Sequence, residues 1–266
     1  MKKHFLSFIV CIVLFASCDT NEPTNKKDNG IGKFSVSESK QVTFSPGNLQ
    51  YYPKHNLWRF AESQLDYIGE SNKNISDTYN GWIDLFGWGT GANPTEWSKN
   101  FSDYSVFIDW GTNVIDNDAP NTWRTITTSE LCYLLYERYN ADSLIGIAQI
   151  DSINGMIILP DSWICPSNIT FKPGLASKNY YAEYAKYQTF TISEWAKLEQ
   201  NGALFLPAAG RRGSSDVGAI QWYGYYWLAD VSDEYESDNF FFRSDFYQLQ
   251  DNDCYRGYSV RLVKDL

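Results

Sequence analysis

The sequence is poor in histidine, cysteine and methionine, and these shortages exclude several kinds of catalytic site. It has two histidines, five cysteines and two methionines in 266 residues. His4 lies in the N-terminal leader described below, so His55 is the one histidine left to activate a serine or cysteine nucleophile. His55 lies in the segment YYPKHNLWRF, between two strand-like runs, and we interpret it as a turn residue. No catalytic residue is predicted.

Metal-binding patterns are missing as well. The chain has no Cys-x-x-Cys motif and no Cys/His spacing typical of zinc. Beyond the leader and the candidate lipidation site, the cysteines are Cys132, Cys165 and Cys254. An exported chain could form one disulfide among them, and the sequence does not select the pair. No metal and no cofactor is predicted.

Long hydrophobic runs are also lacking. The N-terminal run Phe5–Ala16 is interrupted by Ser7 and is shorter than the roughly 20 residues of a membrane-spanning helix. Lys2 and Lys3 precede it, which is typical of a secretory signal peptide. We therefore predict that residues 1–17 are a signal peptide.

The end of this run resembles a bacterial lipoprotein box. Small Ala16 and Ser17 directly precede Cys18, where a narrow peptidase pocket needs small side chains and the thiol takes the lipid. Several acyl chains on one cysteine give a stable membrane anchor. We predict lipidation at Cys18 and a location on the outer membrane, at the cell surface. The alternative is an ordinary signal peptide with an incidental cysteine.

Basic residues are outnumbered, with 22 Lys and Arg against 32 Asp and Glu, a formal charge of −10 and a pI near 4.7. Loss of Lys2 and Lys3 with the leader makes the balance more negative. Nucleic acid is excluded as a partner, because proteins that bind it carry a basic surface.

Residues 18–32 have almost no apolar side chains, so we expect a flexible tether there.

The remainder, residues 33–266, is predicted to be a single α+β domain. Strand-like alternation and a hairpin come first, with the strands LQYY and LWRF flanking Pro53–Asn56. Two helices are expected in the middle, because Thr127 and Thr191 each precede a glutamate by three residues, as in a capping box. Strands and turns follow, and this order of elements indicates α+β. Between the hairpin and the first helix, tryptophan-rich loops are expected to insert Trp82, Trp88 and Trp110 into the core.

Several segments together resemble a known family. WRTITTSELCYLLYERYNA is similar to the first-helix motif of the C-type-lectin-like fold in relatives of the formylglycine-generating enzyme, and YRGYSVRLV is similar to their final strand. FSPGNLQYYPKHNLWRFAE, GWIDLFGWGTG, NGMIILPDSW and FLPAAGRRG resemble Bacteroidetes surface lipoproteins related to the Fibrobacter succinogenes major paralogous domain. The resemblance covers nearly everything from Lys33 onward. It implies two helices packed on antiparallel sheets with long aromatic-rich loops.

Two departures limit what the resemblance implies about activity. The formylglycine-generating enzymes use a pair of cysteines near the end of the fold, and here that region has only Cys254. The Glu-Pro-Asn, Gln-Pro-Asp and Trp-Asn-Asp tripeptides of calcium-dependent lectins are missing. The scaffold carries over, and a scaffold does not fix a function.

A binding surface is expected late in the chain, where aromatic residues lie among acidic ones. Aromatic rings with polar rims are used in sugar stacking and in protein interfaces. We expect at least two rings of the segment QWYGYYW to be exposed, and Phe240 to face away from the core if Phe241 faces it. The alternative is that both faces of this strand are covered. The candidate ligand-binding residues are Trp222, Tyr223, Tyr225, Tyr226, Asp238, Phe240, Tyr247 and Asp251.

The function predicted from these features is a non-catalytic, surface-anchored module that binds a glycan or a protein. A structural subunit of a surface assembly is the alternative, and an oxidase like the formylglycine-generating enzyme is less favoured. With 32 acidic residues, carboxylate pairs at glycosidase spacing arise by chance, so they indicate nothing. Arg124 and Arg261 are interpreted as structural, donating to buried carbonyl groups near the chain end.

Overall fold

The computed structural model describes residues 32–176, 183–213 and 216–266. The predicted signal peptide 1–17, Cys18 and nearly all of the predicted tether 18–32 lie outside these residues. Within them, every helix is too short or too polar to cross a membrane. The described chain is α+β, with most of its regular structure in antiparallel sheets.

In the described residues, 14 strands form five sheets. The strands are β1 (Phe34–Ser35), β2 (Gln41–Phe44), β3 (Leu49–Tyr52), β4 (Leu57–Phe60), β5 (Ile145–Ile150), β6 (Ile153–Ile158), β7 (Thr189–Phe190), β8 (Leu204–Pro207), β9 (Arg211–Arg212), β10 (Val217–Gly218), β11 (Gly224–Val231), β12 (Glu236–Arg243), β13 (Phe246–Asp253) and β14 (Val263–Asp265). The sheets have the strand orders β1-β2-β14, β3-β4, β7-β5-β6-β8, β9-β10 and β11-β12-β13.

The helices are few and short. They are α1 (Thr128–Cys132), continued by a π-helical turn (Tyr133–Glu137), α2 (Tyr184–Tyr187) and α3 (Ile192–Gln200). Both predicted capping boxes are confirmed: Thr127 and Thr191 each accept from the amide three residues on, and Glu130 and Glu194 return the bond. The predicted hairpin of β3 and β4 is also confirmed, with a 3-10 turn at Pro53–His55.

The core is divided by two sheets into three layers of side chains. Helix α3 covers one face of the β7-β5-β6-β8 sheet through Trp195 and Leu198. The other face of that sheet and helix α1 pack against one face of the β11-β12-β13 sheet. The tryptophan-rich loops, with Trp88 and Trp110 buried, cover the opposite face of the β11-β12-β13 sheet. Trp82, also expected in the core, is half-buried and lies under the Arg59 guanidinium.

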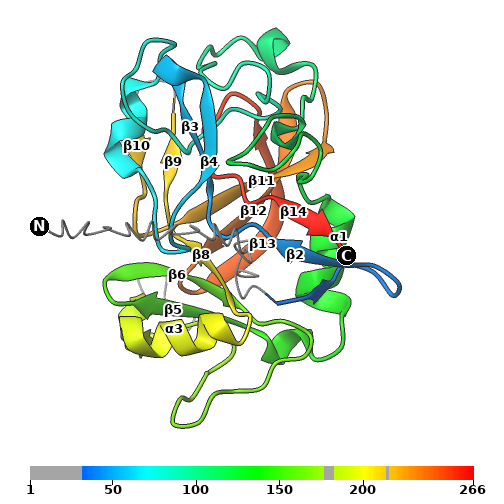
Figure 1. Cartoon of the computed structure of the whole chain (residues 1–266), viewed down its shortest axis with the longest axis vertical. Helices are drawn as coiled ribbons and strands as arrows, with labels where there is room; N and C mark the ends of the chain where they lie inside the picture. Colours follow the sequence, from blue (N-terminus) through cyan, green and yellow to red (C-terminus); the bar gives the residue numbers. More distant parts are fainter. Residues whose placement is uncertain (1–31, 177–182, 214–215) are drawn as a thin grey trace, which may run out of the picture.

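The two ends of the described chain meet. Strand β14 pairs with β2 (Figure 1), and Arg124 fastens this pair to the start of α1. Its guanidinium donates to both carboxylate oxygens of Glu130, at 2.7 and 2.8 Å, and to Asp265 at 2.6 Å. Lys40 adds a third donor to Glu130 at 2.9 Å. Arg124 is structural, as expected, but its main partners are carboxylates rather than carbonyl groups.

Glu130 should make stability depend on pH. Burial alone would raise its pKa, but hydrogen bonds from Arg124, Lys40 and Thr127 outweigh burial and lower the pKa to about 2. A carboxyl whose pKa is lowered by folding stabilises above its unfolded value, and this contribution is lost as the pH falls through the folded value. We expect Glu130→Gln to lower the free energy of unfolding by about 1–3 kcal/mol at neutral pH.

The difference between wild type and Glu130→Gln should shrink as the pH falls from about 5 towards 2, measured by urea denaturation across that range. Glu194→Gln is the matched control, because Glu194 closes the other capping box and accepts its hydrogen bonds from Thr191. These bonds also lower the pKa of Glu194, so the control should show the same direction of pH dependence with a smaller amplitude. Parallel curves for wild type and Glu130→Gln at all pH values would contradict this account.

Candidate ligand-binding site

The β11-β12-β13 sheet, where most of the predicted site residues lie, is covered on both faces. Phe240 and Phe242 pack into the layer under α1, and Phe241 packs into the layer under the tryptophan-rich loops. Phe240 is 1% exposed, and Tyr225 and Tyr226 are 9% and 4% exposed. Of the four rings in QWYGYYW, Trp222 is exposed, Tyr223 is half-buried, and Tyr225 and Tyr226 are buried, so the expectation of at least two exposed rings is not met. For Phe240 the alternative holds: both faces of the strand are covered, because alternate side chains enter opposite faces and here each face has its own core.

The predicted residues also do not form one site. Direct cross-strand partners share a face, so the pairs Tyr226–Phe240 and Asp238–Asp251 lie on the α1 side, together with Tyr247. Tyr225 lies on the opposite side, stacked on Tyr258. Trp222 and Tyr223 lie in the turn that precedes β11, and Tyr223 packs against Tyr225 and Phe241 on that opposite face.

Trp222 is the predicted aromatic residue that stays exposed, with 57% of its surface accessible. It lies in a turn over residues 219–223, which we call the Trp222 turn. Ala219 and Gln221 in this turn adopt left-handed backbone conformations, with φ of 59° and 66°. Such conformations cost non-glycine residues roughly 1–3 kcal/mol and persist only where the surroundings impose them.

Gln221 is held in that conformation by four hydrogen bonds. Its amide donates to Ala208 at 2.7 Å, and its side-chain nitrogen donates to the Tyr67 hydroxyl at 2.7 Å. Asn154 donates twice, from its backbone amide to the Gln221 side chain at 2.7 Å and from its side chain to the Gln221 carbonyl at 2.8 Å. These bonds fix the turn without using the neighbouring indole.

The backbone of Trp222 is fixed as well. Its amide donates to Ala219, and its carbonyl accepts from the Tyr184 hydroxyl at 3.0 Å. Tyr184 is itself buried, and burial raises the pKa of its hydroxyl, with Asp245 and Tyr223 adding to the effect. The hydroxyl therefore stays a neutral donor at physiological pH. The turn thus holds an exposed indole on a rigid base.

A half-buried aromatic and amide surface continues from the Trp222 turn along β13. Tyr223 packs edge-on against Phe241 with ring centres 5.5 Å apart, and Phe246 follows at 6.3 Å from Phe241. Gln248 is the cross-strand partner of Phe241, and its side chain donates to Gln250 at 2.6 Å. Hydrogen-bonding amides thus lie beside partly exposed rings.

The α1 side of the β12–β13 hairpin is acidic. Glu236 faces Asp253 and Asp238 faces Asp251 directly across the strands. Burial raises the pKa of Glu236, and Asp251, Asp233 and Asp253 raise it further. Asp238 accepts from the hydroxyls of Thr128 and Ser232, so part of its charge is used to fix α1. Like charges placed opposite each other destabilise a strand pair.

A buried carboxylate, Asp84, was not among the candidate residues. It lies in the loop expected to insert Trp82 and Trp88 into the core, but no local pattern distinguishes it from the many exposed acidic residues. Its two oxygens accept from the Ile68 amide and the Asn72 side chain, each at 2.8 Å, and Asn72 accepts in return from the Asp84 amide. Burial raises its pKa to about 6, against the effect of these hydrogen bonds. The pair is a clamp between a 3-10 turn (Gly69–Asn74) and the core.

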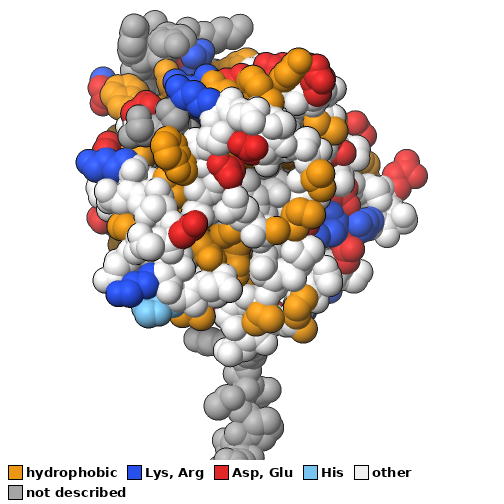
Figure 2. All heavy atoms as spheres, turned by 90° about the horizontal axis from the view of Figure 1, so that it is seen from above, with side chains coloured by type: hydrophobic (Ala, Val, Ile, Leu, Met, Phe, Trp, Pro, Cys, Tyr) orange, Lys and Arg blue, Asp and Glu red, His pale blue; other side chains and the backbone are white. Residues whose placement is uncertain are grey.

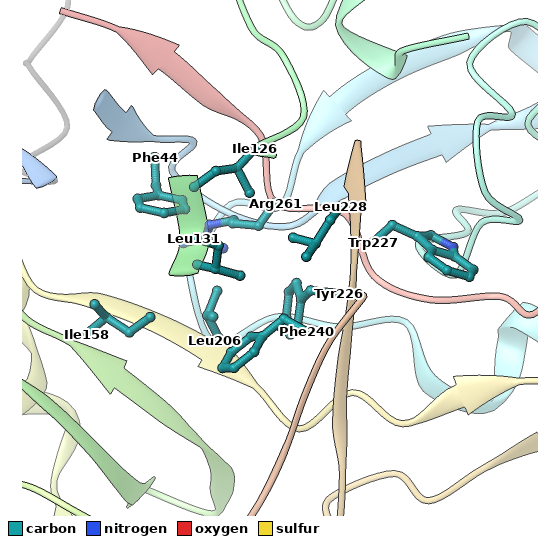
Figure 3. A pocket seen from close by; sticks show the side chains of 10 residues that line it. All are labelled: Phe44, Ile126, Leu131, Ile158, Leu206, Tyr226, Trp227, Leu228, Phe240 and Arg261. Carbon is teal, nitrogen blue, oxygen red and sulfur yellow. The ribbon is translucent and has the colours of Figure 1, made fainter. Parts of the chain in front are cut away.

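Arg261 lines a small apolar cavity between the β11-β12-β13 sheet and α1 (Figure 3). Its guanidinium donates to the side-chain oxygens of Asn48 at 3.3 Å and Gln64 at 2.7 Å, not to the carbonyl groups expected from the sequence. Burial lowers its pKa to about 10, so it remains charged at pH 7. The cavity volume of about 20 Å³ suits one water molecule rather than an organic ligand.

Other chemistry has little support in the described part of the chain. No three His, Cys, Asp or Glu side chains there are grouped so that they could hold a metal ion. Cys132, Cys165 and Cys254 are all free thiols. Burial raises the pKa of the Cys254 thiol to about 11; Asp253 and Asp233 raise it further, while backbone hydrogen bonds lower it.

Comparison with family models, with curated proteins and with solved structures finds no match.

The Asp84 clamp can be tested by one substitution. In Asp84→Asn, the new amide group must place its NH₂ against one of two donors, the Ile68 amide or the Asn72 side chain. We expect a loss of about 1–3 kcal/mol in the free energy of unfolding, measured by urea denaturation. Asp142→Asn, at an exposed position, is the control and should change stability little. Equal stability of the two variants would show that the clamp contributes nothing.

Proposed function

We propose that the chain is a non-catalytic binding module of a surface lipoprotein, built on a C-type-lectin-like scaffold, that holds a glycan at the Trp222 turn. The resemblance described above and the arrangement of short helices on antiparallel sheets with aromatic loops support the scaffold. The oxidase alternative has less support, because Cys254 is a buried thiol without a cysteine partner among the described residues.

One observation carries the proposal: hydrogen bonds fix the strained backbone of the Trp222 turn, and this fixed turn presents an indole that is 57% exposed. A side chain held rigidly before binding loses little entropy when its ligand arrives. Strained non-glycine backbone of this kind concentrates at ligand sites.

The chemistry next to the indole favours a sugar. A flat, exposed indole stacks on the C–H face of a sugar ring, while the Tyr223 hydroxyl and the amides of Gln248 and Gln250 can bond sugar hydroxyls. The loop-rich end of the molecule shows hydrophobic side chains in several small groups rather than one continuous patch (Figure 2). That distribution gives no support there to a large permanent interface of an assembly subunit.

Trp222→Ala should abolish or strongly weaken glycan binding without altering stability. Loss of an exposed stacking platform should weaken the ligand at least about tenfold, while the melting temperature stays unchanged because the indole makes few contacts. A glycan array followed by calorimetry on the best ligand provides the measurement.

Trp97→Ala is the matched control, because Trp97 is 52% exposed but lies in a different loop. Its glycan affinity should equal that of wild type. Equal binding by wild type and Trp222→Ala would refute the proposed site. Stable co-purification of wild type with a partner protein, with no glycan signal, would favour the assembly subunit instead.

The membrane attachment is tested separately. Cys18→Ala removes the only thiol positioned to receive a lipid after signal cleavage, so the chain should move from the membrane fraction to the soluble fraction. Fractionation and labelling with an alkyne fatty acid provide the measurement, and Cys165→Ala is the control that should keep both label and location. A Cys18→Ala variant that stays labelled would contradict the anchor.

A further inference from the structure

The outer edge of β13 is a regular strand edge that the described residues leave unpaired over most of its length. β13 ends the β11-β12-β13 sheet, and its eight residues pair with β12 in one unbroken register, Arg243–Phe246 through Glu236–Asp253. Across the described ranges, no residue outside β12 makes a backbone hydrogen bond to residues 246–252. An open edge of this length is a template for another strand.

The usual devices that block such an edge are missing from β13. Its sequence FYQLQDND contains no lysine and no proline, and the ladder has no bulge. None of its residues is buried, whereas its neighbour β12 is mostly buried. Charges lie only in its last three residues, at Asp251 and Asp253. The first five residues, Phe246–Gln250, present an uncharged edge.

Charge selects the kind of strand that fits. On the α1 side, Tyr247 and Leu249 are followed along β13 by Asp251 and Asp253, whose neighbours on β12 are Asp238 and Glu236. Arg256 is the cation paired with this group, through Asp253 at 2.9 Å. An added strand would therefore bring its own basic side chains next to the acidic end and its apolar side chains next to Tyr247 and Leu249.

We propose that β13 accepts an extended, basic peptide segment of another protein as a fourth strand of the sheet. Antiparallel pairing is the more stable arrangement, and it requires a segment of the order basic-x-basic-x-apolar-x-apolar. Main-chain hydrogen bonds provide the affinity, and contacts of alternate side chains determine which peptide binds and in which orientation. This site shares strand β13 with the glycan site, which uses Gln248 and Gln250 on the opposite face of the strand, but strand addition does not need the Trp222 indole.

The probe is a fluorescein-labelled peptide, Lys-Thr-Lys-Thr-Val-Thr-Val, titrated with the whole mature chain and followed by anisotropy. Two versions carry N-methyl groups on alternate residues, in the two possible registers. The version that methylates the amides facing β13 should lose binding, and the other should keep it, because only alternate amides of a strand face one neighbour. Equal binding by both methylated peptides would overturn strand addition.

The acidic end is tested by the double variant Glu236→Gln/Asp251→Asn, whose carboxylates make no hydrogen bond among the described atoms. It should bind the peptide about fivefold more weakly, with less dependence on salt. Its melting temperature should stay equal or rise, since like charges are removed from facing positions. Unchanged affinity would overturn the charge argument, as would equal binding of a peptide with glutamate in place of lysine.

Two further results identify the occupant. Trp222→Ala should bind the peptide as wild type does, and loss of binding there would place the peptide on the Trp222 turn and overturn the edge site. Sedimentation of the protein alone should show a monomer at the titration concentrations. A dimer that the peptide dissociates would mean that a second copy occupies the edge, and this would also overturn the proposal.

Discussion

The two-sided burial of the β11-β12-β13 sheet is the constraint from which the rest of the architecture follows. Consecutive phenylalanines at Phe240, Phe241 and Phe242 place large rings on both faces, so neither face can be left to water. One face is closed by α1 and the β7-β5-β6-β8 sheet, and the other by the tryptophan-rich loops. The long loops are therefore a layer of the core, which explains why segments without regular structure contain buried Trp88 and Trp110.

Polar groups inside this core hold distant segments together. Arg261 joins Asn48 and Gln64, while the Gln64 side chain also accepts from the Phe205 amide and donates to Ala203. A buried guanidinium that donates to neutral amide groups, as Arg261 does, is unusual, because buried charges are normally paired with an opposite charge. Its removal would leave two buried amide oxygens without this donor, so the network specifies one arrangement of loops rather than adding net stability.

Local signals in the sequence predicted local structure well. The capping boxes depend on residues three apart, and the β3–β4 hairpin depends on adjacent residues. Both could therefore be predicted from short segments of the sequence. The α+β class followed from the order of such elements. Strand β14 was placed only in part, because Tyr258–Leu262 makes isolated bridges instead of a regular strand. The burial there comes from surrounding loops, which a periodic pattern does not describe.

For the candidate site, the sequence indicated which segment is rich in aromatic residues but not which of those residues are exposed. An aromatic-rich segment could be located, but which ring stays exposed depends on contacts with Tyr67, Asn154 and Tyr184, which are remote in sequence. Nothing local marks Gln221 for a left-handed backbone, since glycine and asparagine are the usual residues there. The open edge of β13 likewise depends on which strands become neighbours, and the sequence alone does not specify that.

In the Trp222 turn, the residues that fix the backbone are different from the residue whose side chain is exposed. Folding and surface recognition therefore do not constrain the same side chain. The bonds that fix it belong to Gln221 and to backbone atoms, so folding imposes almost nothing on the identity of the side chain at position 222. Replacement of that side chain alters what the surface offers while the frame keeps its shape. The position is therefore suited to rapid exchange of ligand preference among descendants of this chain, at little risk to their folding.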